Sequence, residues 1–505
     1  MTTRREVLKY AGLGMGAAAA SVLGVTVNAK ADSNDGQAPT KPGQTEVTDK
    51  SGKRLAVGPE LAWTKVAKKA APADVTVDPT KTAQTILGFG AAFTDAACFT
   101  LSRLSDSDRA NLLHTMFGQD HHALSVGRIP IGASDYSTAA YSYDDGAADP
   151  DLKRFSIDRD LDYVLPTLRA ALSANPDLFL FGSPWSPPGW MKYSNSMLGG
   201  NIRPEHIPTY ARYFQKFVEA YAAAGVTVRA VTTQNEIDAD QGGRMPACPW
   251  PEEDEERLVA ALGPLLEASG TKIWTLDHNY NLFGRALDQL SRPRVKKYVN
   301  TVAWHGYVGT PEMMRNVKEK FPDVEMHWTE GGDDYKFADY LTNWSKWGAT
   351  FAGILGNGPQ SITTWNLALD ERGRPNIGPF DCGGLVQIHS QSKEITQTGL
   401  YWALTHHARA FRRGAVIVAS HDADGDAPSV NGALIGQPAS SSTVTATPNT
   451  AVTSRVYHTA AKNPDGSMVL VLTNPGDAKD VTVACAGQTA KIALTADSIT
   501  TVRWS

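Results

Sequence analysis

Two glutamates, Glu236 and Glu330, close apolar stretches of the sequence, VRAVTTQNE (228–236) and VEMHWTEGG (324–332). A single glutamate at a strand end is usually only solvated, so neither residue is informative by itself. A retaining glycosidase, however, uses two carboxyl groups about 5 to 5.5 Å apart as general acid/base and nucleophile. The acid/base needs a raised pKa, whereas the nucleophile stays ionised between hydrogen-bond donors. The sequence therefore raises the hypothesis that these two glutamates face each other.

Other polar and aromatic residues close the remaining apolar stretches. They are Asp95, Arg128, Asp135, Trp185, Asn235, Asp277, His278, His305, Tyr307, Trp365 and Asn366. Aromatic faces suit the C–H surfaces of a sugar ring, and amides and carboxylates suit its hydroxyls. The set contains neither a Gly-rich phosphate-binding loop nor a cluster with metal-ligand spacing, so we expect no metal site and no cofactor.

Several of these residues also have ordinary structural explanations. Trp185 and Trp365 would fit a hydrophobic core, although the prolines of SPWSPPGW hold Trp185 rigidly. His305 is expected to have its hydrogen bonds satisfied by residues around the site rather than to act as a ligand. Asp277 and His278 are interpreted as a polar strand end without an assigned role.

Eight apolar stretches have the length of strands that are buried on both faces. They span residues 86–93, 123–132, 178–186, 228–236, 271–279, 299–307, 324–332 and 361–369. Helical segments lie between them, as in 206–225, where Tyr210, Phe214, Phe217 and Tyr221 share one face. This alternation predicts an α/β protein with a (β/α)8 TIM barrel over residues 82–410, whose site lies at the C-terminal ends of the strands. An open doubly wound sheet is the alternative.

The sequence pattern changes after residue 410. Short alternating runs separated by NPDGS and NPGD turns predict an antiparallel β-sandwich over residues 411–505. Residues 61–81 have the same character and are expected to add N-terminal strands to this side domain. Residues 32–60 are polar and aperiodic and contain Pro and Gly, so we expect a flexible lead-in.

The N-terminus has the features of a targeting segment over residues 1–31. Arg4 and Arg5 precede the stretch AGLGMGAAAASVLGVTV, and an Ala-x-Ala motif ends just before Asp32. This order resembles a twin-arginine signal peptide and predicts export to the periplasm or the exterior. An amphipathic N-terminal helix is the alternative, and the stretch is too weakly apolar for a good membrane anchor.

The net charge limits the kinds of binding partner, and the cysteine spacing bears on metal binding and disulfide formation. The 48 Lys and Arg and 53 Asp and Glu residues are mixed along the chain, and the net charge of −5 favours neither nucleic acid nor an anionic membrane. The four cysteines show no metal-binding spacing. Cys248 and Cys382 fall in loops on the same rim of the expected barrel and are the favoured disulfide pair, with buried free thiols as the alternative.

A set of motifs occurs together in this chain: QTILGFGAAFTDAA, GRIPIGASDYS, GSPWSPPGWMK, TTQNE, WTEGG and TTWNLALDERGRPN. On these motifs the chain, from about residue 75 to its end, resembles glycoside hydrolase family 30, the glucosylceramidase-type enzymes. The resemblance implies a (β/α)8 barrel with a β-sandwich side domain and hydrolysis of β-glycosides with retention.

The resemblance also implies residue roles. Glu236 becomes the acid/base and Glu330 the nucleophile, while Asp135 and Trp185 correspond to residues that bind the sugar in the −1 subsite. Arg128, Asn235, Tyr307 and Trp365 are implied to line this site or to order its carboxylates. Asn366 is a weaker candidate for its wall, and His305 is also counted among the predicted substrate-binding residues. The chain departs from the family pattern at NEIDAD, which lacks the proline that often follows the acid/base, and at Gly306. Both departures concern the leaving-group preference.

The sequence thus predicts an exported retaining β-glycosidase that acts by double displacement. Its expected substrate is a carbohydrate or glycoconjugate with a neutral sugar, foremost a β-glucoside of the glucosylceramide or β-1,6-glucan type. A β-xyloside or β-fucoside is the alternative for the same chemistry. The rival classes are a non-catalytic carbohydrate-binding barrel and a metal-dependent barrel hydrolase. Endo or exo action and the oligomeric state stay open.

Overall fold

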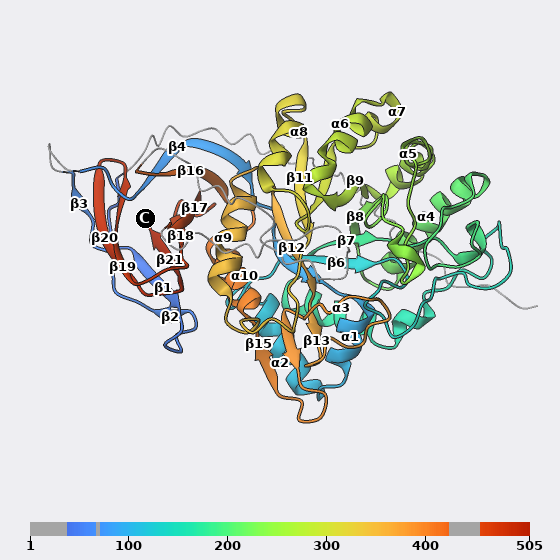
Figure 1. Cartoon of the computed structure of the whole chain (residues 1–505), viewed down its shortest axis with the longest axis horizontal. Coiled ribbons are helices and arrows are strands. Elements are labelled where there is room, and N and C mark those ends of the chain that lie inside the picture. Colours follow the sequence, from blue (N-terminus) through green and yellow to red (C-terminus); the bar gives the residue numbers. More distant parts are fainter. Residues whose placement is uncertain (1–37, 67–70, 424–454) are drawn as a thin grey trace, which may run out of the picture. The chain divides into compact units, whose positions relative to one another are not determined.

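The computed structural model describes residues 38–66, 71–423 and 455–505. The predicted signal segment, residues 1–31, therefore lies outside the described residues. Within them the chain forms a closed eight-stranded barrel, a ten-stranded sheet and a small three-stranded sheet (Figure 1).

The barrel strands are all parallel and follow one another around the barrel in chain order. They are β5 (Gly88–Ala92), β6 (Val126–Pro130), β7 (Phe179–Ser183), β8 (Val228–Thr232), β9 (Lys272–Asn279), β10 (Thr301–His305), β11 (Glu325–Glu330) and β12 (Ser361–Asn366). Each falls within one of the eight predicted stretches, and β12 pairs with β5 to close the barrel. The (β/α)8 prediction is confirmed and the open sheet is excluded.

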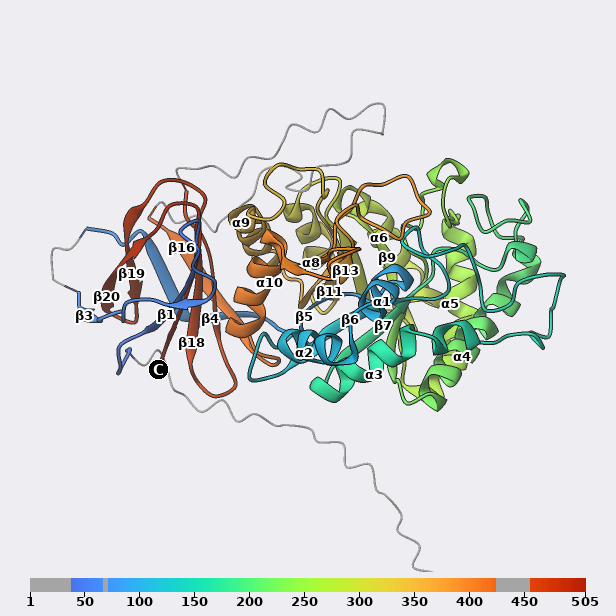
Figure 2. The same cartoon turned by 90° about the horizontal axis from the view of Figure 1, so that it is seen from below.

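Helices between the strands cover the outside of the barrel. They are α1 (Asp95–Ser102), α2 (Asp106–Phe117), α3 (Val164–Ala174), α4 (Ile207–Ala223), α5 (Glu252–Leu266), α6 (Phe283–Ser291), α7 (Pro293–Lys296), α8 (Arg315–Lys320), α9 (Trp344–Leu355) and α10 (Gly399–Ala410). Figure 2 shows α2 and α3 side by side outside the strands. In α4 the predicted stripe of Tyr210, Phe214, Phe217 and Tyr221 is fully buried. Burial of this apolar face is what holds such a helix against the sheet.

Close strand packing explains one glycine of the first barrel strand. A Cβ on Gly90 would lie 1.6 Å from the carbonyl oxygen of Val126 in β6. Only glycine allows the two backbones to approach this closely. Gly90 therefore fixes the contact between the first two barrel strands.

The ten-stranded sheet forms the β-sandwich and combines strands from both ends of the chain. Its strands are β1 (Gln44–Thr48), β2 (Ala56–Val57), β3 (Thr64–Lys65), β4 (Val75–Thr85), β16 (Val416–Asp422), β17 (Tyr457–Lys462), β18 (Met468–Asn474), β19 (Lys479–Cys485), β20 (Gln488–Leu494) and β21 (Ser498–Trp504). Val77, Leu470, Val483 and Trp504 pack in its core. The three-stranded sheet consists of β13 (Ala368–Leu369), β14 (Val386–Ile388) and β15 (Ile395–Gln397).

The expectation of a flexible lead-in over residues 32–60 is wrong for its described part. Residues 44–48 form β1, which pairs along its whole length with β21, and residues 56–57 form β2. The polar composition misled because β1 lies near the edge of the sheet, where its outward-facing residues meet solvent. Its alternate residues, Thr45 and Val47, are buried.

Side chains from the last barrel helices bond the sandwich directly. In α10, His406 bridges Thr501 of β21 at 2.8 Å and Thr48 of β1 at 2.9 Å. In α9, the Trp344 indole donates to the Asp497 carbonyl at 2.8 Å. These bonds tie the two domains through buried groups rather than through a linker alone.

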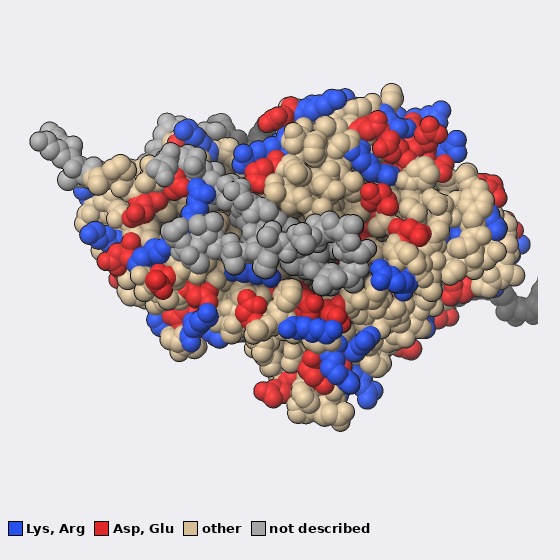
Figure 3. Space-filling model, viewed as in Figure 1, with Lys and Arg blue, Asp and Glu red and all other residues tan. Residues whose placement is uncertain are grey.

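Acidic and basic side chains are interspersed on the face seen in Figure 3, in keeping with the small net charge. Among the described residues, no helix combines the length and apolar character needed to cross a bilayer.

Candidate active site

Arg128 links the strands that carry the two glutamates. It lies in β6 and is completely buried. Its Nη2 donates to Asn235 Oδ1 at 2.7 Å and to Asp277 Oδ2 at 2.8 Å, and its Nη1 donates to Glu330 Oε2. A buried guanidinium needs such charged and polar partners to offset the loss of hydration. Arg128 thereby fixes the nucleophile candidate relative to the loop that carries Glu236.

Asp277 accepts more hydrogen bonds than any other site carboxylate described. Its Oδ1 accepts from His305 Nε2 at 3.0 Å and from Thr329 Oγ1 at 2.6 Å. Besides Arg128, its Oδ2 accepts from Ser183 and from Thr232, the latter at 2.7 Å. Burial by itself would raise the pKa of Asp277, but Arg128 and His305 hold it well below its usual range. Asp277 is therefore an anion that organises groups from β6, β7, β8, β10 and β11.

A bulge in β9 turns Asp277 into this position. Ala303 of β10 pairs with Leu276 and Trp304 pairs with His278, so Asp277 is skipped in the ladder. Leu276 and Asp277 have positive φ values of 73° and 46°. Bulges of this kind re-aim side chains next to active sites. The sequence prediction left Asp277 without a role, and it is the main residue that sequence reasoning missed.

Glu330, the last residue of β11, is held at both oxygens. Tyr307 donates from its hydroxyl to Oε1 at 2.9 Å, and Arg128 donates to Oε2. His305 Nε2 lies 3.9 Å from the same Oε2. Donors at both oxygens fix the orientation of the carboxylate, as a nucleophile requires.

Glu236 lies in a turn after β8 and is less buried than Glu330. Its φ is 48°, and its backbone N–H donates to the Asp277 carbonyl at 2.9 Å. Gln241 donates to Oε2 at 2.5 Å, and His305 Nδ1 lies 3.8 Å from Oε1. One imidazole ring is thus within 4 Å of both candidate catalytic carboxylates.

The charge balance around Glu236 differs from the sequence expectation. Burial favours the neutral acid, but His305 and His278 outweigh it and hold the pKa of Glu236 below its usual range. Burial also disfavours a charged His305, yet Glu330, Asp277 and Glu236 together raise the pKa of this imidazole to about 9. The expected raised pKa of the acid/base is therefore wrong for the free enzyme, because a cationic imidazole stands beside it.

Aromatic residues and one further carboxyl complete the site. Trp185 and Trp365 stack with ring centroids 5.1 Å apart, and the Arg128 guanidinium lies 4.6 Å from the Trp185 ring. Asp135 is buried, and its pKa is raised well above the usual value by burial and by Glu330 and Glu236. The two rings thus pack on each other and on Arg128, and Asp135 places a carboxyl near the two glutamates.

Two predicted site residues make their contacts elsewhere. Asn366 accepts from Thr94 at 2.8 Å through Oδ1, so its carbonyl belongs to the barrel wall. Asp95 accepts from the Thr138 backbone and from the Tyr163 hydroxyl at 2.7 Å each. Conversely, Gln241 contacts Glu236 although no sequence signal beyond its nearness to NE pointed to it.

The predicted disulfide between Cys248 and Cys382 is not formed, and all four cysteines are free. Cys248 is buried in the main barrel core, whereas Cys382 packs with Trp365 and Tyr136 in a separate cluster. A position on the same rim did not bring the two thiols together, because Cys248 is buried in one cluster and Cys382 is half-buried against another.

A parallel eight-stranded barrel with two glutamates at its strand ends, aromatic walls and a β-sandwich side domain defines a β-glycoside hydrolase. The chain belongs to glycoside hydrolase family 30: the family's TIM-barrel domain matches residues 86–411 and its β-sandwich domain matches residues 441–502.

Relatives and solved structures are in line with this family. The chain is 32% identical over 368 residues to an endo-1,6-β-D-glucanase of Neurospora crassa, covering 68% of this chain and 74% of the relative. It is 31% identical over 380 residues to the lysosomal acid glucosylceramidase of Mus musculus, covering 69% and 73%. A solved endo-β1,6-glucanase superposes with a TM-score of 0.77 and 26% identity, covering 92% of this chain and 99% of that one.

Proposed function

We propose that this β-glycoside hydrolase is a retaining β-glucosidase whose substrate is a β-1,6-linked glucan. The observation that supports the saccharide substrate is the polar loop that follows Glu236. Asp238, Asp240 and Arg244 are exposed there, and Gln241 reaches the Glu236 carboxylate. A leaving group that is itself a sugar can hydrogen-bond to such a loop, whereas a ceramide would place apolar chains against it.

In the proposed reaction Glu330 attacks the anomeric carbon and forms a glycosyl–enzyme ester. Tyr307 and Arg128 hold its two oxygens in position for this attack. Glu236 protonates the departing oxygen and afterwards takes a proton from the water that hydrolyses the ester. Asp135 and the Trp185 and Trp365 rings bind the sugar.

The proton for the first step comes through His305 in this proposal. The free enzyme holds that proton on the imidazole, with Nδ1 3.8 Å from Glu236 Oε1. As Glu330 loses its charge to the sugar, an anion that favours the charged imidazole disappears. Transfer of the proton to Glu236 then makes this residue the acid.

Two variants test the assigned roles. Glu330→Gln is expected to abolish hydrolysis of every β-glucoside. Glu236→Gln is expected to lose about 10²- to 10⁴-fold on substrates with poor leaving groups and far less on activated aryl β-glucosides. Glu325→Gln, at the other end of β11, is the matched control and is expected to keep full activity. Equal losses by Glu236→Gln on both substrate types would contradict the acid role.

A substrate comparison tests the leaving group. The wild-type enzyme is expected to have a higher kcat/KM on β-1,6-linked glucooligosaccharides than on glucosylceramide in vesicles, aryl β-xylosides or aryl β-fucosides. A preference for glucosylceramide would overturn the choice of substrate but leave the roles of the glutamates intact.

Export through a twin-arginine-type signal is part of the same proposal and rests on Arg4, Arg5 and the Ala-x-Ala motif before Asp32. The mature protein is expected outside the cytoplasm with Asp32 at its N-terminus, as N-terminal sequencing would show. Replacing both arginines by lysine is expected to retain the precursor in the cytoplasm; unchanged export would refute the signal type.

A further inference from the structure

Two histidines flank the Glu236 carboxylate, and the reaction proposed above requires only one of them. His278 lies near the end of β9 and His305 at the end of β10. One ligand atom from each histidine and one carboxylate oxygen of Glu236 lie within 4.8 Å of one another. Two imidazoles and a carboxylate are a common ligand set for divalent zinc.

Both imidazoles are oriented by a carboxylate on their far side. His305 Nε2 bonds Asp277 Oδ1 at 3.0 Å, and His278 Nε2 bonds Asp238 Oδ1 at 2.6 Å. Donation of Nε2–H to these carboxylates leaves Nδ1 of each ring as the free ligand atom. Neither Nδ1 has a hydrogen-bond partner among the described residues, although both rings are buried. Metal-binding histidines are typically supported in this way.

The geometry needs only a small contraction to hold a metal. Bond lengths of about 2.0 to 2.1 Å place neighbouring ligand atoms of a tetrahedral zinc about 3.3 Å apart. Glu236 Oε1 already lies 3.8 Å from His305 Nδ1. Zinc bound here would take the place of the proton on His305.

We propose that Glu236, His278 and His305 form a zinc-binding site, and that Zn²⁺ bound there inhibits the enzyme by occupying the acid/base carboxylate. The inhibition rests on the proposed role of Glu236, whereas the binding does not. The metal is an inhibitor in this proposal and takes no part in hydrolysis.

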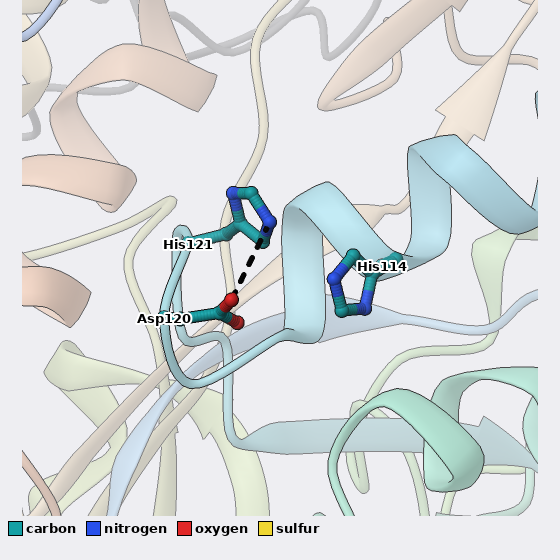
Figure 4. A group of neighbouring side chains, drawn as sticks. All are labelled: His114, Asp120 and His121. Carbon is teal, nitrogen blue, oxygen red and sulfur yellow. Dashed lines mark ion pairs between the residues drawn. The ribbon is translucent and has the colours of Figure 1, made fainter.

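A second group of possible ligands provides the control. His114, at the end of α2, lies near Asp120 and His121 on the loop that follows (Figure 4). His114 and Asp120 are exposed, and His121 Nε2 lies 3.7 Å from Asp120 Oδ2 within the same group. The carboxylate beside the His121 imidazole, that of Asp120, is thus itself one of the three ligand candidates, so it is not a separate supporting group. A double variant, His114→Ala with His121→Ala, removes this group without touching the catalytic residues.

Titration calorimetry with ZnCl₂ on the metal-stripped full-length protein tests binding directly. Wild type and the His114/His121 double variant are expected to share one high-affinity site. Asp238→Asn, which removes only a supporting carboxylate, is expected to weaken it about 10- to 100-fold. His278→Ala and Glu236→Gln are expected to lose it. The proposal would be overturned if Asp238→Asn and Glu236→Gln bound zinc as tightly as wild type. It would also be overturned if only the double variant lost zinc binding.

Inhibition is measured separately on an aryl β-glucoside, as the fraction of each variant's own metal-free rate. The zinc concentration for half-inhibition is expected to rise about 10- to 100-fold in Asp238→Asn and to stay unchanged in the double variant. Tight binding without inhibition would refute the inhibitory part. If the protein hydrolyses no β-glucoside yet binds zinc through these residues, the proposed function fails and the metal site stands.

Discussion

Replacement of Asp277 by asparagine tests whether this residue organises the site. The side chain is almost the same size, so the change removes a charge and turns one acceptor oxygen into a donor amide. Asp277 is completely buried and accepts from Arg128, His305, Ser183, Thr232 and Thr329. Neither amide orientation satisfies all five donors.

The expected loss can be worked out from these contacts. The threonine and serine hydroxyls can turn and accept, but Arg128 Nη2 and the His305 Nε2–H cannot. At least one charge-assisted hydrogen bond, worth about 1.5 to 3 kcal/mol, is therefore lost whichever way the amide faces. Arg128 and His305 also lose one of their carboxylate partners while keeping Glu330 nearby, and breaking a buried ion pair costs about 3 to 5 kcal/mol in comparable cases. We expect Asp277→Asn to destabilise the protein by about 3 to 5 kcal/mol.

Urea unfolding followed by tryptophan fluorescence measures this difference in the free energy of unfolding. Asp238→Asn is the matched control, because Asp238 also bonds a histidine beside Glu236 but its side chain is 40% exposed. The control is expected to cost less than about 1 kcal/mol. A loss below about 1 kcal/mol for Asp277→Asn as well would refute the view that Asp277 holds the network together.

Three further outcomes are expected. Tyr307→Phe removes one donor to Glu330 and should lower kcat/KM about 10- to 100-fold, because a hydrogen bond to a charged group contributes about 1.5 to 3 kcal/mol. A change in kcat/KM below about twofold in steady-state kinetics would contradict a positioning role for Tyr307. Burial raises the pKa of Asp144 from 3.8 in the unfolded chain to about 6 in the folded protein. The protonated carboxyl therefore stabilises the fold fully below about pH 4, and this stabilisation is lost as the pH rises through about 6. The melting temperature of wild type minus that of Asp144→Asn should therefore fall between about pH 4 and pH 7, and a flat difference would refute the shift. Gly90→Ala forces a methyl group against the Val126 carbonyl and should abolish folding or cost more than about 3 kcal/mol; a stable variant in thermal unfolding would contradict the close strand contact.

The barrel was predictable because each of its strands is a continuous apolar run with a polar end. That pattern also placed Glu236, Glu330, Arg128 and Tyr307 among the expected site residues, since strand ends of one barrel meet at one rim. In the structure Arg128 and Tyr307 both contact Glu330. The role of Asp277 was not predictable, because it depends on a bulge that shifts the pairing of β9 with β10 by one residue. The spacing of apolar residues predicts which residues are buried, but it does not predict where the hydrogen-bond register between two strands shifts.

The pKa of Glu236 and the state of the cysteines were beyond the sequence for a related reason. Both depend on which side chain from a distant strand or loop arrives next to the group. His305 is far from Glu236 in the chain but lies 3.8 Å from it in space. Strand β1 was missed because its partner, β21, is at the opposite end of the sequence.

The pairing of β1 with β21 also has a consequence for synthesis of the chain. Gln44 pairs with Arg503 and Thr48 pairs with Ile499. The first described strand, β1, can therefore pair with β21 only after almost the whole polypeptide has been synthesised. On a ribosome the barrel segments emerge earlier, while β1 and β4 stay exposed on a nascent chain. Completion of the sandwich is then the late event, and loss of the last seven residues would leave β1 without this partner.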